Sequence, residues 1–65
     1  MAPIEYRYRL LNGSELVATG HLSVEEPLEV GAELELAGHR GTVRSVEPIL
    51  GTRELRLVVV IAREA

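Results

Sequence analysis

The segment from Leu55 to Ala62 constrains the fold of this chain more than any other feature, because it is apolar on both faces. In its sequence, LRLVVVIA, both alternating sets of a strand are almost wholly apolar. Such a run is typical of a strand that is covered on both sides. One cover is the core of the protein itself. In a chain of only 65 residues, the second cover is most economically another copy of the same chain.

The length limits how much stability the chain obtains from its own core. The sequence predicts one domain, residues 1–65, and a domain of this size buries only about 60% of its unfolded surface. Disulfides, a metal or oligomerisation usually stabilise such small domains. The chain has no cysteine, which excludes disulfides and thiolate metal sites. Oligomerisation or unusually good packing is therefore expected.

The charged residues are of two kinds only. All ten acids are Glu and all seven bases are Arg, with a net charge of −3. An acidic chain is not expected to bind nucleic acid or anionic membranes through its overall charge.

The chain carries no recognisable targeting segment. Its first residues, MAPIEYR, lack the apolar stretch of a signal peptide. The longest apolar run, Leu57 to Ala62, is far shorter than the ~20 residues that span a bilayer. We therefore expect a cytoplasmic protein with no membrane partner.

Glycines and prolines divide the chain into five runs of strand length, and no window has the apolar repeat of a helix. The fold class is therefore all-β. The predicted strands cover residues 4–11, 15–23, 32–37, 41–47 and 54–62. The predicted core follows their alternation and consists of Ile4, Tyr6, Tyr8, Leu10, Leu16, Ala18, Leu22, Leu34, Leu36, Val43, Val46, Leu55, Leu57, Val59 and Ile61.

The reversal at Asn12–Gly13 decides which face of the second strand is buried. A bare two-residue turn there would point Leu16 away from the tyrosines of the first strand. We prefer a three-residue loop, 11–13, because it places Leu16 opposite Tyr8 and unites the apolar faces. Gly20 then lies where a tyrosine ring from the first strand can cover its bare backbone.

Two further irregularities are expected. Leu28 and Val30, in the acidic loop after the second strand, are predicted to close one end of the core. Val43 and Val46 are three residues apart, which breaks the period of two. A bulge near residues 44–45 would let both valines point inward.

One hairpin carries a resemblance. The residues VGAELELAG from Val30 to Gly38 are followed, after a turn expected at 38–41, by TVRSV from Thr42 to Val46. This pattern resembles the middle hairpin of small bacterial SH3-like β-barrel proteins and covers about a quarter of the chain. The resemblance implies a small five-stranded antiparallel SH3-like barrel, in a family whose members mostly have no assigned function. An open meander or an incomplete OB-type barrel is the alternative.

The sequence offers no pattern that is typical of catalysis. His21 and His39 are the only imidazoles, and even with Glu as further ligands they lack the close spacing of a zinc site, which needs three or four ligands. No Gly-x-Ser-x-Gly motif, aspartate or phosphate-binding glycine loop occurs. We expect a protein that is not an enzyme, with no catalytic residue, no cofactor and no metal.

The outer face of the sheet carries the candidate functional residues. If the first strand lies between the second and the fifth, arginines stand within an apolar stripe, a combination that interface cores favour. The leading interpretation is a non-catalytic interaction module that forms a homodimer or binds another protein. Nucleic-acid binding through the arginine-bearing face is the alternative, and a small-ligand domain is a third. The predicted interface residues are Arg7, Arg9, Val17, His21, Arg56, Val58 and Val60.

Overall fold

A computed structural model describes residues 3–61 and contains five strands joined by turns and loops. No helix occurs within this range. Each strand lies within two residues of its predicted position, although Ala62, at the end of the predicted last strand, is outside the described residues. The strands are β1 (Ile4–Asn12), β2 (Glu15–Val24), β3 (Glu33–Leu36), β4 (His39–Pro48) and β5 (Leu55–Ile61).

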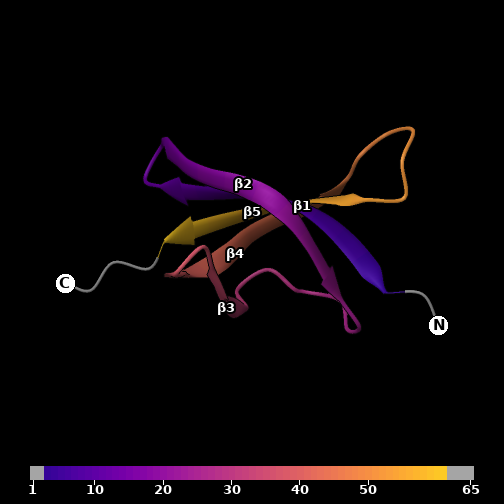
Figure 1. Cartoon of the computed structure of the whole chain (residues 1–65), viewed down its shortest axis with the longest axis horizontal. Helices are drawn as coiled ribbons and strands as arrows, with labels where there is room; N and C mark the ends of the chain where they lie inside the picture. The colour runs from indigo at the N-terminus through magenta and orange to yellow at the C-terminus, as the bar shows by residue number, and fades with distance from the viewer. Residues whose placement is uncertain (1–2, 62–65) are drawn as a thin grey trace.

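The strands form one curled mixed sheet in the order β2-β1-β5-β4-β3, which makes a half-barrel (Figure 1). As expected, β1 lies between β2 and β5. The expectation of a wholly antiparallel sheet is wrong, because β1 and β5 are parallel. Their pairing aligns Tyr6 with Leu55, so β5 enters the sheet at the end where β1 begins. The alternation of a strand reads the same in both directions, so the sequence pattern does not contain this orientation.

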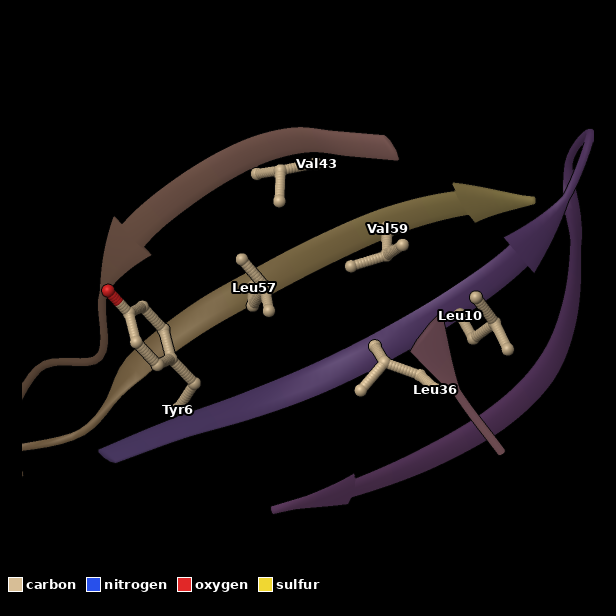
Figure 2. Packing of buried hydrophobic residues seen from close by; sticks show 6 residues of the cluster. All are labelled: Tyr6, Leu10, Leu36, Val43, Leu57 and Val59. Carbon is tan, nitrogen blue, oxygen red and sulfur yellow. The ribbon is translucent and has the colours of Figure 1, made fainter. Parts of the chain in front are cut away.

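The core fills the concave side of the half-barrel. Figure 2 shows Leu36 of the short strand β3 lying over β1, so that the curled sheet packs against itself. The buried hydrophobic residues of the described range are Tyr6, Leu10, Leu36, Val43, Leu57 and Val59. Around them pack Ile4, Tyr8, Ala18, Leu22, Val24, Leu28, Ala32, Leu34, Val46, Leu55 and Ile61. Every predicted core residue except Leu16 is therefore in or against the core.

Leu16 is 51% exposed, because the β1–β2 hairpin has a different register from the predicted one. The turn consists of two residues, Gly13 and Ser14, and pairs Leu11 with Leu16. A bulge at Val17 then restores the core register, with Ala18 opposite Leu10. The extra residue turns Leu16 outward while Ala18 stays inward. An unbroken alternation in the sequence conceals this bulge.

Two glycines lie where the backbone is closely approached. A Cβ on Gly20 would lie 2.7 Å from the Tyr8 hydroxyl oxygen, so the ring covers the bare backbone as expected. A Cβ on Gly41 would lie 2.5 Å from Val59 Cγ1 and 2.9 Å from the carbonyl oxygen of Val60. Both glycines allow the sheet to curl tightly over the core.

The β3–β4 hairpin turns at Ala37 and Gly38, two residues earlier than the centre of the expected turn at 38–41. Both residues have positive φ, 52° and 81°, as a two-residue hairpin turn requires. The expected bulge in β4 is confirmed, because the register shifts between Val43 and Ser45.

We expect Ala37→Gly to stabilise the protein, because Ala37 occupies the left-handed region at φ 52°. Removal of the Cβ relieves the strain of the left-handed conformation, and the greater freedom of glycine in the unfolded chain offsets part of this gain. The net gain in stability should be about 0.5–1 kcal/mol. Urea denaturation measures the difference. The control is Ala32→Gly at a position that packs against the core, which should destabilise; a loss of stability in both variants would contradict the prediction.

The loop between β2 and β3 closes one end of the core through Tyr6. The backbone N–H of Leu28 donates a 2.9 Å hydrogen bond to the buried Tyr6 hydroxyl. Further along, the N–H of Gly31 donates to the Val43 carbonyl at 2.9 Å, which ties the loop to β4. Leu28 packs against the core as predicted. The prediction for Val30 is wrong, because its side chain is exposed and the loop is tied to β4 through its backbone.

We expect Tyr6→Phe to destabilise the fold by about 1–3 kcal/mol, because the Leu28 N–H loses its acceptor. The matched control is Tyr8→Phe, since the Tyr8 hydroxyl forms no hydrogen bond with a described residue and should cost little. Thermal denaturation of both variants provides the comparison. Equal losses would mean that the Tyr6 hydroxyl does not secure the loop.

Leu57 is 0% exposed at the centre of the core. We expect Leu57→Ala to cost about 2–5 kcal/mol, enough to unfold a domain with a small core. Leu50 supplies the same substitution at a side chain that is 95% exposed, where the change should stay within about 0.5 kcal/mol. Circular dichroism during urea denaturation distinguishes the two. A folded Leu57→Ala variant with an unchanged midpoint would refute the assignment of faces on β5.

Candidate functional site

The outer, convex face of the sheet is built from three cross-strand rows. Arg7, Arg9 and Leu11 alternate with core residues of β1, so they point away from the core. The register of β1 with its two neighbours then fixes which side chains stand beside them. The rows are His21–Arg7–Arg56, Thr19–Arg9–Val58 and Leu16–Leu11–Val60.

Six of the seven predicted interface residues lie in these rows, and Val17 lies in the bulge beside Leu16. Residues two apart in a strand are separated by about 7 Å, so the first and third rows are roughly 13 Å apart. The outer face is therefore graded, with arginines at one end and apolar side chains at the other. From the sequence these residues are expected to form one surface, whereas in the structure the arginines and the apolar side chains gather at opposite ends of it.

Glu54 is the central acid of the arginine end, and sequence analysis did not identify it. Its side chain is only 18% exposed. Arg7 Nη2 lies 3.0 Å from Glu54 Oε1, and Arg7 Nε donates a 3.1 Å hydrogen bond to the same oxygen. His21 Nδ1 lies 3.3 Å from Glu54 Oε2. One carboxylate thus contacts side chains from both β1 and β2.

The loop from 49 to 54 places Glu54 in this position. Thr52 donates its hydroxyl to the Ile49 carbonyl at 3.1 Å, and the same hydroxyl accepts from the Glu54 N–H at 3.1 Å. Gly51, with φ 82°, supplies the left-handed residue within this turn. Figure 1 shows the loop at the end of the sheet opposite the β1–β2 turn, and Leu55, the residue after the loop, pairs with Tyr6 near the start of β1.

A hollow of about 210 Å³ lies beside this ion pair on the outer face. We call it the arginine hollow, because three of its lining residues are arginines from β1 and β5. Among the described residues, Arg9 and Arg56 form no ion pair and no hydrogen bond through their side chains. The lining residues are Arg7, Tyr8, Arg9, Thr19, Ile49 and Arg56.

The apolar end of the outer face surrounds the third row. Leu16 is 51% exposed and Val17 is 43% exposed, next to half-buried neighbours on β1 and β5. We call this surface the apolar patch; it consists of Leu11, Leu16, Val17, Val58 and Val60. Sequence analysis missed Leu11 and Leu16. The adjacent leucines at 10 and 11 were the available signal, because they fill both faces of β1 as the valines fill both faces of β5.

Two further features, a metal-binding cluster and a membrane-spanning helix, are absent from the described part of the chain. Residues 3–61 contain no group of three or more His, Cys, Asp or Glu side chains placed to hold a metal ion. Over the same residues, no helix is long and apolar enough to cross a membrane.

Comparisons with protein-family models, with curated proteins and with solved structures find no match for this chain.

Proposed function

We propose that the protein is a non-catalytic interaction module that self-associates through the apolar patch. The observation that carries this proposal is the exposure of Leu16 and Val17 beside Leu11 and Val60 on one face of the sheet. Full burial of one such side chain stabilises by about 1.5–3 kcal/mol, so covering several together favours association. With six buried hydrophobic residues among positions 3–61, the domain gains substantially from this cover.

The free edge of β2 supports a second copy as the partner. Over its ten residues β2 pairs only with β1, and no other described residue forms a backbone hydrogen bond with it. The strand contains no proline or lysine to block pairing, and Leu16 and Val17 belong to it. Antiparallel pairing of two β2 strands about a two-fold axis would bring two apolar patches close together.

The alternatives have less support from the geometry. Single-stranded nucleic acids are commonly bound by base stacking on exposed aromatic rings, but Tyr6 is buried and the Tyr8 ring lies on Gly20. An SH3-like identity rests on the β3–β4 hairpin alone, and an all-antiparallel barrel of that kind has no place for the parallel β1–β5 pair. A cytoplasmic location remains part of the proposal, supported by the absence of cysteine.

We expect the double variant Leu16→Glu, Val17→Glu to shift the protein from dimer to monomer. Four carboxylates in the dimer would have to be desolvated without partners. Both side chains are about half exposed in the single chain, so the fold itself should survive. Sedimentation velocity across a range of protein concentrations measures the change, with circular dichroism to check the fold.

The matched control is Arg53→Glu, which changes the net charge by the same amount at an exposed loop position far from the apolar patch. This control should remain dimeric. Dissociation in both variants would attribute the effect to general repulsion and not to the patch. A wild-type chain that stays monomeric at high concentration would overturn the proposed self-association.

A further inference from the structure

The arginine hollow concentrates positive charge on an acidic protein. Arg7 and Arg56 are direct cross-strand neighbours, and Arg9 lies one row further along β1. Like charges that stand directly opposite each other in a sheet are destabilising. The chain nevertheless has a net charge of −3 and uses only arginine as a base. A repulsive cluster of this kind is typical of a site that is completed by an anion.

The charged side chains around the hollow indicate what charge a bound anion would carry. Among the described residues, Glu54 is the only carboxylate that forms an ion pair with these arginines. Of the three arginines it contacts only Arg7. Glu47 is the cross-strand neighbour of Arg56 on β4 but forms no ion pair with it and does not line the hollow. Three guanidinium groups and the one carboxylate leave two positive charges beside the hollow.

We propose that the arginine hollow binds a phosphate dianion, either free or as the phosphoryl group of a small molecule. Two positive charges match the charge of phosphate, and guanidinium groups donate paired hydrogen bonds to its oxygens. The Thr19 hydroxyl is a further donor at the rim. At about 210 Å³ the hollow is smaller than the ~300 Å³ and more of sites that enclose whole ligands, so it holds the phosphoryl group and little else.

This proposal does not depend on self-association. The His21–Arg7–Arg56 row lies roughly 13 Å from the Leu16–Leu11–Val60 row, and Arg9 and Thr19, which also line the hollow, lie about 7 Å from it in the middle row. The monomeric variant Leu16→Glu, Val17→Glu should therefore still bind phosphate saturably, with a lower affinity because its two added carboxylates lie about one row from Arg9 and Thr19. A wild-type chain that dimerises but does not bind phosphate would overturn the phosphate site alone. The two proposals can therefore be tested independently.

The test is titration of the ¹⁵N-labelled full chain with inorganic phosphate, followed by NMR at constant ionic strength with chloride as the replacement anion. Saturable shifts should appear at the backbone of Arg9, Thr19 and Arg56. Each of Arg9→Gln and Arg56→Gln should weaken binding by about tenfold, the loss of a charge-assisted hydrogen bond. Arg44→Gln, an exposed arginine on β4 outside the hollow, should leave the affinity unchanged.

Parallel titrations with phenyl phosphate and acetate identify the ligand class. Tighter binding of phenyl phosphate assigns the site to a phosphate monoester with its organic part against Ile49, and equal affinity assigns it to free phosphate. Acetate should bind at least about tenfold more weakly, because it carries one charge in place of two. Shifts that grow linearly without saturation, or that are the same in Arg56→Gln, would overturn the proposal.

Thermal denaturation gives a second readout that a purely structural role would not produce. Phosphate stabilises most proteins by exclusion from their surface, so the comparison is between variants at one phosphate concentration. Without phosphate, Arg56→Gln should melt at a higher temperature than wild type, because the repulsion with Arg7 is gone. In phosphate the wild type should gain more than the variant. An equal gain in both would overturn the site.

Discussion

The parallel pairing of β1 with β5 is the contact on which the rest of the structure depends. These two strands supply four of the six buried side chains, Tyr6, Leu10, Leu57 and Val59. The other strands have no independent support, because β2 pairs only with β1, β3 pairs only with β4, and β4 joins the sheet through β5. The pair also joins the first and last strands of the chain, so its formation requires closure of a long loop.

The same pairing produces the two candidate functional surfaces. Its register sets Arg7 beside Arg56 at one end and Leu11 beside Val60 at the other. A slip of one residue would turn Arg56 and Val60 toward the core and expose Leu57 and Val59. Burial of the inner face therefore fixes the arrangement of the outer face. The packing of the apolar side chains on the inner face keeps Arg7 and Arg56 side by side despite their repulsion.

The individual residues of the outer face could be predicted, but their grouping could not. Alternation against a buried set places Arg7, Arg9 and Val58 outside without any knowledge of the fold. The arginine hollow also needs Ile49 and the ion pair of Glu54, which come from the loop after β4, with Glu54 47 residues beyond Arg7. The exposure of Leu16 depends on the bulge at Val17. Nothing in the local sequence marks that bulge, whereas the spacing of Val43 and Val46 marks the one in β4.

The sequence by itself determined that the chain is all-β, where its strands lie and that its last strand is apolar on both faces. These properties are local, because the period of side chains along a strand and the turn preference of glycine act within a few residues. Only the tertiary structure decided that β1 and β5 run parallel, that Leu16 faces outward and that three arginines share one hollow. Strand direction and register are properties of pairs of strands, and an alternating pattern is the same whichever way its partner runs.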